Sequence, residues 1–370
     1  MRIIVSGGGT GGHIYPAITL IKNIAKQVPN AEFLYVGTEA GLEADIIPKE
    51  NIPFQAVAIR GFERRLSLKN IKTLAMAAVS IFSARRIIRK FSPDVVVGTG
   101  GYVCGPVLLA ASLMGIPTLI QEQNVIPGIT NKLLARFVTK VAVGCREAAP
   151  YFPAKKVVYT GNPIRQEVLT ADRREALERF GFDPEKQTVL ISGGSRGARS
   201  INNACAGMYR FFAGRSDVQF LHVTGQQEYK AVLEKIAQAG VDLEAATNIR
   251  VEPYLYDMPS ALAIADLAVF RAGATGLAEL TAKGIAAVLI PYPYAAENHQ
   301  EHNARALEQA GAAVMILNRE LTAQKLQSTV EELLGSKEKL TAMAAASRRA
   351  GKPQAAADIA AMIVKLAGKR

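Results

Sequence analysis

Short apolar runs alternate with longer amphipathic stretches along most of the chain. The runs are rich in Val, Ile, Leu and Phe and are bounded by Gly, Pro or polar residues. Runs of this kind are typical of strands buried in a parallel sheet, and their alternation with helical patterns is typical of βαβ units. The pattern predicts strands at 3–5, 33–36, 54–59, 95–97, 118–120, 140–143, 189–191, 220–223, 249–252, 267–270, 287–290 and 313–316.

One segment of the chain resembles another. The stretch IIVSGGGTGG at residues 3–12 recurs as VLISGGSRGA at residues 189–198, and each copy is a strand that ends in Ser-Gly-Gly before a helical pattern. Two similar α/β units are implied, each an open parallel sheet covered by helices. Gly161 and Pro163 interrupt regular structure between them. We therefore expect domains at 1–163 and 164–340, followed by C-terminal helices at 341–370 that pack back towards the first domain.

Charge is distributed unevenly over these halves. Of the formal net charge of +12, residues 1–165 carry +11 and residues 166–370 carry +1. Nine bases and one acid fall within residues 60–90, and there they flank the uncharged helical stretch 73–84. A basic patch indicates an anionic partner. The absence of Trp and the low aromatic content offer no stacking platform for nucleic acid, which leaves an anionic membrane surface or an ordinary helix packed on the sheet with a solvated basic end.

The compartment is predicted from three further features. The three cysteines are far apart and form no CxxC pair, which is typical of a reducing cytosol. No export signal precedes the first predicted strand. The longest uncharged run, 95–121, is interrupted by seven Gly and Pro residues and is expected to form strand, loop, helix and strand rather than a membrane span.

Glycine-rich loops follow several predicted strands and precede helices. They lie at 7–12, 98–102, 193–197 and 271–275. Such loops suit anions, because free backbone amides and the helix dipole point at the same spot. Residues 7–12 satisfy the GxGxxG pattern of dinucleotide sites, but only Glu39 remains as a candidate for the ribose-binding acid. A nucleotide triphosphatase is disfavoured, since His13 follows the loop where a P-loop has Lys.

Taken in order, seven motifs carry a family resemblance: GGGTGGHIYPAI, GTGGYVCGP, QEQNVIPG, GNPIR, GGSRGARSIN, RAGATGLAEL and ENHQEHNA. Together they resemble the MurG family of bacterial N-acetylglucosaminyltransferases from residue 1 to about residue 315. The resemblance implies a GT-B fold, with the active site between two Rossmann-like domains. It also implies inverting transfer of GlcNAc from UDP-GlcNAc to the C4 hydroxyl of MurNAc in undecaprenyl-pyrophosphoryl-MurNAc-pentapeptide (lipid I), for peptidoglycan synthesis.

The resemblance also implies site residues, position by position. Donor contacts fall on Thr10, Gly11, Gly12, Asn124, Arg165, Ser195, the backbone of Leu255, Ala274, Thr275, Gly276, Leu277, Ala278, Glu279 and Gln300. Acceptor and diphosphate loops fall on Gly100, Gly101, Tyr102, Glu122 and Gln123. Glu279 would accept hydrogen bonds from both ribose hydroxyls, and Arg165 and the helix N-terminus at Gly197 would face the diphosphate. No metal and no other cofactor is expected, since the chain has no Asp-x-Asp.

Histidine is the expected general base for the acceptor hydroxyl. His13 stands at the edge of a glycine loop and is the candidate, with a purely orienting role as the alternative. His222 lies in a strand pattern and is expected in the core. His299 and His302 resemble a metal pair only superficially. The sequence departs from the family pattern at Cys104, Gln121, Arg196, Phe270 and Gly276, which removes a second histidine and one donor-site hydroxyl.

The expected localisation is peripheral, on the cytoplasmic side of the bacterial membrane, with cell-wall synthesis and division proteins as further partners. Three alternatives stay open from the residues alone. The first is a GT-B transferase with another lipid acceptor, such as diacylglycerol. The others are a dinucleotide-dependent oxidoreductase built on residues 7–12 and a catalytically silent binding protein for sugar nucleotides.

Overall fold

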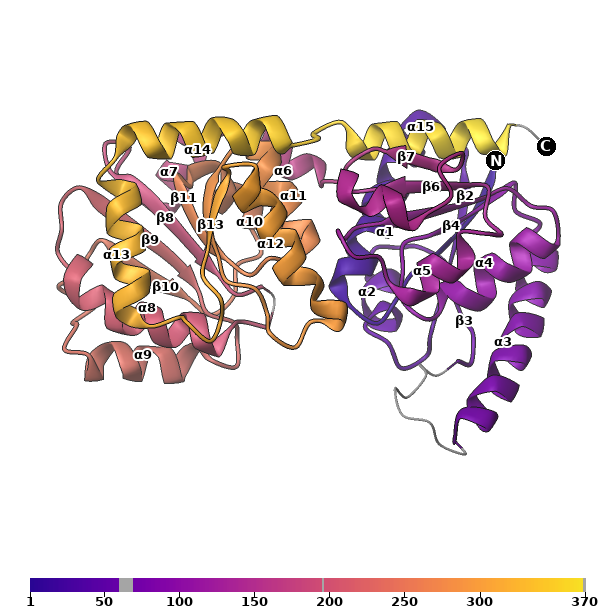
Figure 1. Ribbon diagram of the computed structural model, residues 1–370, viewed down its shortest axis with the longest axis horizontal. Coiled ribbons are helices and arrows are strands. Elements are labelled where there is room, and N and C mark those ends of the chain that lie inside the picture. The colour runs from indigo at the N-terminus through magenta and orange to yellow at the C-terminus, as the bar shows by residue number, and fades with distance from the viewer. Residues whose placement is uncertain (60–68, 195, 369–370) are drawn as a thin grey trace. The chain divides into compact units, whose positions relative to one another are not determined.

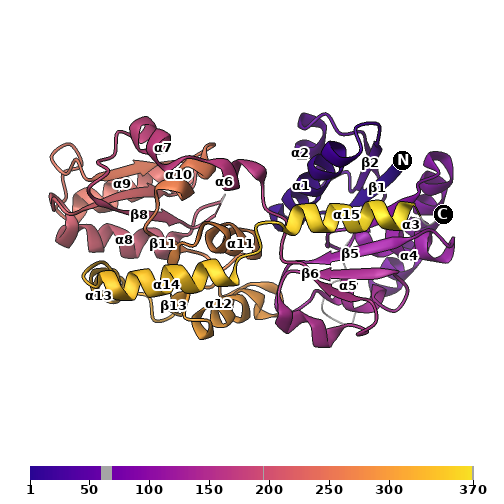
Figure 2. The ribbon, with the colours of Figure 1, turned by 90° about the horizontal axis from the view of Figure 1, so that it is seen from above.

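The computed structural model describes residues 1–59, 69–194 and 196–368, and only the backbone is described at 69–78. The described residues group into two compact units. One unit comprises Met1–Ile164 and Pro353–Arg370, and the other comprises Arg165–Lys352. In each unit, helices lie on both faces of a parallel sheet (Figures 1 and 2).

The first unit contains a seven-stranded sheet in the order β3-β2-β1-β4-β5-β6-β7. Its strands are β1 (Arg2–Ser6), β2 (Glu32–Gly37), β3 (Phe54–Ala56), β4 (Val95–Gly98), β5 (Thr118–Glu122), β6 (Lys140–Val143) and β7 (Val157–Tyr159). Its helices are α1 (Gly11–Gln27), α2 (Glu43–Lys49), α3 (Lys69–Phe91), α4 (Cys104–Leu113), α5 (Ile129–Leu134), η1 (Arg146–Tyr151) and α15 (Ala355–Ala367).

Alternating side chains supply the two hydrophobic layers of this unit. Ile3 and Val5 of β1 pack with α1, α2 and α15, whereas Ile4 packs with α3 and α4. Because successive strand residues point to opposite faces, a strand buried on both sides is an uninterrupted apolar run, as the sequence predicted. The uncharged run 95–121 forms β4, α4 and β5, which confirms its expected strand, loop, helix and strand order.

The second unit contains a six-stranded sheet in the order β10-β9-β8-β11-β12-β13. Its strands are β8 (Gln187–Ser192), β9 (Val218–Val223), β10 (Ile249–Glu252), β11 (Leu267–Phe270), β12 (Ala286–Leu289) and β13 (Ala313–Met315). Its helices are α6 (Gln166–Thr170), α7 (Arg173–Phe180), α8 (Arg199–Phe212), α9 (Tyr229–Gln238), α10 (Met258–Ile264), α11 (Ala274–Lys283), η2 (Ala296–Asn298), α12 (His299–Gln309), α13 (Ala323–Leu334) and α14 (Lys337–Ala350).

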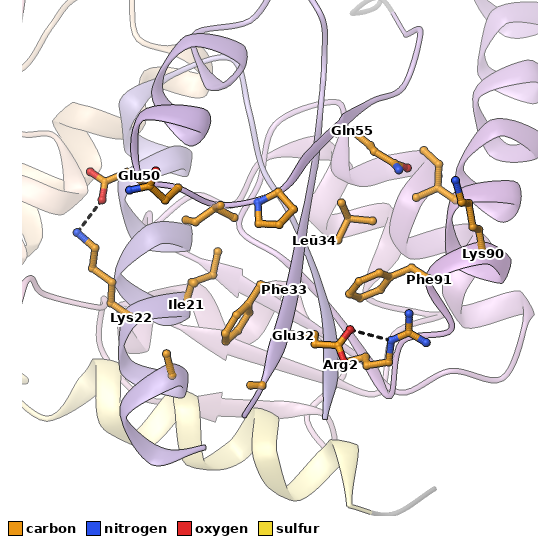
Figure 3. A pocket seen from close by; sticks show the side chains of 16 residues that line it. Arg2, Ile21, Lys22, Glu32, Phe33, Leu34, Glu50, Gln55, Lys90 and Phe91 are labelled. Carbon is orange, nitrogen blue, oxygen red and sulfur yellow. Dashed lines mark ion pairs between the residues drawn. The ribbon is translucent and has the colours of Figure 1, made fainter. Parts of the chain in front are cut away.

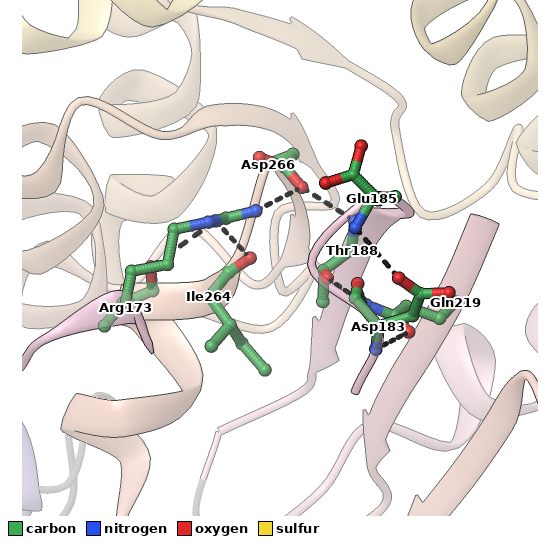
Figure 4. Close-up of polar contacts among 8 residues, drawn as sticks. Arg173, Asp183, Glu185, Thr188, Gln219, Ile264 and Asp266 are labelled. Atoms are coloured by element: carbon green, nitrogen blue, oxygen red, sulfur yellow. Dashed lines mark hydrogen bonds and ion pairs between the residues drawn. The ribbon is translucent and has the colours of Figure 1, made fainter. Parts of the chain in front are cut away.

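A polar network joins elements at the amino edge of the second sheet (Figure 4). The Asp266 carboxylate accepts hydrogen bonds from the Thr188 amide (2.8 Å) and the Arg173 guanidinium (3.0 Å). Gln219 of β9 donates to the Thr188 hydroxyl (2.9 Å) and accepts from the Asp183 amide (3.0 Å). These contacts fasten α7, β8 and β9 together at the edge opposite the glycine loops.

The C-terminal helices divide between the units. The helices within residues 341–370 were expected to pack back towards the first domain; α15 groups with the first unit, whereas α14 groups with the second. Gly351 and Pro353 separate the two helices, and α15 packs against α1 (Figure 2). α15 buries an Ala-rich face, whereas α14 buries Leu340, Met343, Ala346 and Ser347.

Candidate active site

The order in which strands are added to the first sheet reverses between β1 and β4. From β1 the chain builds outward to β2 and β3 on one side and, after crossing back, to β4 through β7 on the other. In open α/β sheets, ligands bind at the carboxyl edge beside such a switch point. Here the glycine loop after β1 meets the glycine loop after β4, since the Gly8 amide donates to the Gly100 carbonyl (3.2 Å). A side chain at Gly101 would overlap the Gly8 backbone, so the close approach requires glycine.

His13 lies in the first turn of α1, directly after this loop. Its Nδ1 is 3.0 Å from the Gly8 carbonyl oxygen. A carbonyl oxygen only accepts, so this contact places the proton on Nδ1 and leaves Nε2 as the basic nitrogen. The Thr99 hydroxyl donates to the His13 carbonyl (2.7 Å), and the imidazole packs over Gly100. The expected base therefore lies at the switch point, in the tautomer that a base requires.

The loop after β5 is organised by Glu122. This carboxylate is buried, and it accepts hydrogen bonds from the Asn124 amide (3.0 Å), the Gly128 amide (3.2 Å) and the Asn131 side chain (2.8 Å). Two backbone amides of the loop and one side chain of α5 are thereby fixed around one carboxylate. Glu122 thus positions Asn124, the predicted donor contact, and its oxygens are directed into the loop.

Beside this loop lies a buried amide network. Gln123 donates to the Thr99 carbonyl (2.6 Å), and Asn162 donates to the Gln123 carbonyl (3.0 Å). Gln121, which stands in place of the second histidine of the family pattern, donates to the Asn162 side chain (2.9 Å). Gln121 and Gln123 are almost fully buried, so they support the loops rather than present their side chains to solvent.

The second sheet has its own switch point between β8 and β11. The loop of residues 193–197 follows β8, and α8 begins at Arg199, two residues beyond Gly197. Ser195 lies outside the described residues, so its predicted role has no geometry here. The loop of residues 271–275 follows β11 and leads into α11, which carries the predicted contacts Ala274, Thr275, Gly276, Leu277, Ala278 and Glu279.

Glu279 and Arg165 are paired. Arg165 Nε lies 2.8 Å from Glu279 Oε1, and the Glu279 side chain is buried. Burial raises the pKa of Glu279, and the Arg165 guanidinium acts in the opposite direction. Among the described residues no hydrogen bond reaches Oε2, which leaves one carboxylate oxygen for a ligand. Glu279 is therefore buried and paired, and the Arg165 guanidinium, which was expected to face the diphosphate, is directed at Glu279.

Gln300 and Leu255 lie in the same unit. The Gln300 side chain accepts a hydrogen bond from the Tyr292 amide (2.9 Å) at the first turn of α12. Leu255 is half-buried in the loop after β10. Of the predicted donor contacts, Thr10, Gly11, Gly12 and Asn124 belong to the first unit and the remainder to the second.

Two structural residues at these edges were not predicted from the sequence. Glu43, the first residue of α2, accepts a hydrogen bond from the loop of residues 7–12. Arg271 donates to the carbonyls of Ile290 and Pro291 and to the side chains of Ser200 and Asn318. Burial lowers the pKa of Arg271 to about 10. Hydrogen bonds to partners that are distant in the sequence leave no local sequence pattern from which they could be predicted. The glycines packed around Glu43 are a pattern that becomes meaningful only once the structure is known.

The remaining histidines lie elsewhere. His222 is fully buried in β9 beside Asn202 (3.1 Å), and burial lowers its pKa to about 3, which confirms the expected core position. His299 Nδ1 contacts the Ala296 carbonyl. No cluster of three or more His, Cys, Asp or Glu side chains suited to a metal ion occurs in the part of the chain that the structure describes.

A cavity of about 680 Å³ lies away from the glycine loops (Figure 3). Arg2, Glu32 and Phe33 at the amino ends of β1 and β2 line it, together with Lys90 and Phe91 at the end of α3. Arg2 pairs with Glu32 (3.5 Å), and Lys22 pairs with Glu50 (2.8 Å) at its rim. The cavity is therefore at the amino edge of the sheet, opposite the predicted site residues.

The arrangement of sheets and loops is that of a known class. Residues 3–143 match the model of the glycosyltransferase family 28 N-terminal domain, and residues 188–360 match that of its C-terminal domain. A crystal structure of Acinetobacter baumannii MurG is similar with a TM-score of 0.78 and 30% identity, covering 98% of this chain and 99% of that one. The chain is thus a glycosyltransferase with the GT-B fold.

Its relatives define the group more narrowly. A protein of Desulforamulus reducens is 48% identical over 367 residues, 99% of both chains, and one of Listeria welshimeri is 49% identical over 359 residues, 97% of this chain and 98% of that one. Both are named UDP-N-acetylglucosamine--N-acetylmuramyl-(pentapeptide) pyrophosphoryl-undecaprenol N-acetylglucosamine transferase. The chain belongs to the MurG family of N-acetylglucosamine transferases within glycosyltransferase family 28.

Proposed function

We propose that the chain transfers GlcNAc, with inversion, from UDP-GlcNAc to the C4 hydroxyl of MurNAc in lipid I. In this reaction the acceptor oxygen forms a bond to C1 of GlcNAc as its proton passes to His13 Nε2, and UDP leaves with the electron pair of the broken bond. The observation that carries this proposal is the contact of His13 Nδ1 with the Gly8 carbonyl oxygen. This contact keeps the proton on Nδ1 and leaves Nε2 free to accept a proton at the switch point of the first sheet.

The donor is assigned chiefly to the second unit. Oε2 of Glu279 accepts from the ribose, while Arg165 holds Oε1 and so fixes the carboxylate. The first turn of α8 faces the diphosphate, since free amides at a helix N-terminus bind anions. We assign no metal or other cofactor to the reaction, and the acceptor diphosphate is assigned to the loops that carry Gly100, Gly101, Tyr102 and Gln123.

The lipid-linked acceptor is reached at a membrane surface. On the exposed side of α3, Val79 is 63% and Phe82 71% accessible, and the basic residues Arg85, Arg86, Arg89 and Lys90 follow them. Leu113 of α4 and Leu133 of α5 are also exposed, and α4 packs against both α3 and α5. We call these four apolar residues the apolar face. Apolar side chains bordered by bases suit the headgroup region of an anionic leaflet, which for this acceptor is the cytoplasmic one.

Part of the basic segment is not described. Arg60, Arg64 and Arg65, and the side chains of Lys69 and Lys72, lie outside the described residues. None of the helices in the described ranges combines the length and hydropathy of a membrane span.

An acceptor screen tests the proposal. Labelled UDP-GlcNAc is supplied with EDTA and either a short-chain lipid I analogue or diacylglycerol in mixed micelles, and lipid-bound label is measured. We expect label in the lipid I analogue and none in diacylglycerol. Label in diacylglycerol alone would instead assign another acceptor, and transfer only in the absence of EDTA would contradict the metal-free reaction.

A further inference from the structure

Glu43 is buried beside the glycine loop, and among the described residues it has no basic partner within ion-pair distance. Its carboxylate accepts three hydrogen bonds instead. Oε1 accepts from the Thr38 amide (3.0 Å) and the Thr38 hydroxyl (2.7 Å), and Oε2 accepts from the Gly9 amide (3.0 Å). A carboxylate removed from water is retained at such a place only with good donors, and here the donors belong to two loops at the carboxyl edge.

Three glycines make room for this side chain. A Cβ at Gly8, Gly37 or Gly41 would overlap the Glu43 side chain. The end of β2, the turn before α2 and the loop after β1 therefore all close around one carboxylate. This packing fixes the position of the carboxylate, so that its bond to Gly9 has little freedom to shift.

Glu43 and His13 bind opposite ends of the same peptide group. The peptide between Gly8 and Gly9 presents its carbonyl oxygen to His13 Nδ1 (3.0 Å) and its amide to Glu43 Oε2 (3.0 Å). Because a peptide group is planar, holding its N–H direction also holds the direction of its C=O. A carboxylate on the N–H also polarises the carbonyl, which strengthens its bond to the imidazole.

We propose that Glu43 is a positioning residue for His13 and acts through the Gly8–Gly9 peptide group. The peptide takes the place of direct contact between acid and imidazole: the carboxylate fixes the peptide, the carbonyl keeps the proton on Nδ1, and Nε2 stays available as base. This inference rests on the proposed function for its kinetic consequence. The tautomer of His13 is measured without any substrate, so the positioning role of Glu43 and the proposed function can fail separately.

Glu43→Gln is the informative substitution. The amide keeps the size of the carboxylate but has only one oxygen, which the two Thr38 donors take. Its NH₂ group then faces the Gly9 N–H, so donor meets donor and the peptide is released. Asp94→Asn is the matched control, because Asp94 accepts from the Arg2 amide (2.8 Å) at the other end of β1.

The kinetic experiment measures the effect of Glu43→Gln on kcat and KM in two backgrounds, one that retains His13 and one that carries His13→Ala. We expect Glu43→Gln to lower kcat by about 10- to 100-fold, as misplacement of a catalytic group does, with KM for UDP-GlcNAc changed by less than about twofold. In a His13→Ala background the same substitution is expected to change kcat by less than about twofold. Asp94→Asn leaves kcat unchanged. An equal loss in both backgrounds would overturn the proposal.

The spectroscopic arm records ¹⁵N chemical shifts of the four histidines, with His13 assigned by the His13→Ala variant. Wild type is expected to show protonated Nδ1 at His13, and Glu43→Gln a mixture of tautomers. An unchanged His13 tautomer in folded Glu43→Gln would overturn the proposal. Should that variant fail to fold, Thr38→Val removes one bond to Oε1, and a partial tautomer change is expected; no change would overturn the proposal equally.

Discussion

Glu122 and Glu279 are both buried carboxylates at the sheet edges, but their charges are compensated differently. Glu122 is surrounded by amide donors from its own loop, whereas Glu279 faces the Arg165 guanidinium. An acid saturated by its own loop orders that loop. An acid held through one oxygen keeps the other for a ligand, so Glu279 is the one that we assign to the donor.

Replacing Glu279 should weaken donor binding selectively. In Glu279→Gln the charge-assisted hydrogen bond that Oε2 accepts from the ribose is lost, at about 1.5–3 kcal/mol. We therefore expect KM for UDP-GlcNAc to rise by about 10- to 100-fold while KM for the lipid I analogue stays within about twofold. Steady-state kinetics with each substrate varied in turn measure both constants.

Glu178→Gln is the control for this prediction. Glu178 also pairs with an arginine of the same unit, Arg174 (3.4 Å), but that pair lies on the exposed side of α7. Removing it should change neither KM, since exposed pairs contribute little. Equal KM values for UDP-GlcNAc in wild type and Glu279→Gln would remove Glu279 from the donor site.

His222 gives the stability a pH dependence. Burial lowers its folded pKa from 6.5 to about 3, so the unfolded chain binds the proton first as pH falls. The stability from neutral His222 is complete above pH 6.5 and is lost as pH falls towards 3. Between pH 7 and pH 5 this amounts to about 2 kcal/mol. Urea unfolding should show that His222→Gln loses about that much less than wild type over this interval, and equal losses would contradict the assignment.

Contacts between loops could not be predicted from the residues. His13 stood out because it follows a glycine loop, but Glu43 binds that loop from a helix thirty residues further along. Glu279 seemed an ordinary helix residue until Arg165 was placed against it. Hydrogen bonds of this kind depend on three-dimensional proximity, and only the family resemblance indicated Glu279 in advance.

At the level of elements, the apolar runs predicted the sheets well. The strands at 140–143, 249–252 and 267–270 have the bounds that were expected. β7 was missed, because Val157–Tyr159 is a half-buried edge strand of three residues next to two lysines. β3 ends at Ala56, three residues before the predicted end. β10 is also an edge strand, so an edge position alone does not obscure the bounds; β3 and β7 differ from it in having only three residues each.

The apolar face of α3 to α5 predicts membrane affinity. Ser80, Ala84 and Ile88 form the buried side of α3, so Phe82 contributes little to the core. Phe82→Ser should reduce binding to vesicles with anionic lipid by about 10-fold in cosedimentation, since burial of an aromatic side chain contributes roughly 1.5–3 kcal/mol. Tyr256→Ser, at a residue 92% exposed in the second unit, is the control. Equal binding by wild type and Phe82→Ser would exclude this face.

For the whole molecule, the two sheets share one plan but differ in charge. Both reverse direction at a switch point flanked by glycine loops, yet residues 1–165 carry almost all of the excess positive charge. A similar architecture with different surfaces suits two different substrates, one soluble and one lipid-linked. On this division we assign the base and the acceptor to the first unit, and Glu279 and the donor to the second.

Transfer by the His13→Ala variant tests the central claim most directly. Labelled UDP-GlcNAc and a short-chain lipid I analogue are mixed with EDTA, single-turnover rates are measured, and the anomeric configuration of the product is determined by NMR. We expect a β-linked product from the α-linked donor and a rate that falls by about 10²–10⁴ in His13→Ala, with donor affinity retained. An α-linked product, or a variant that transfers at the wild-type rate, would contradict the account.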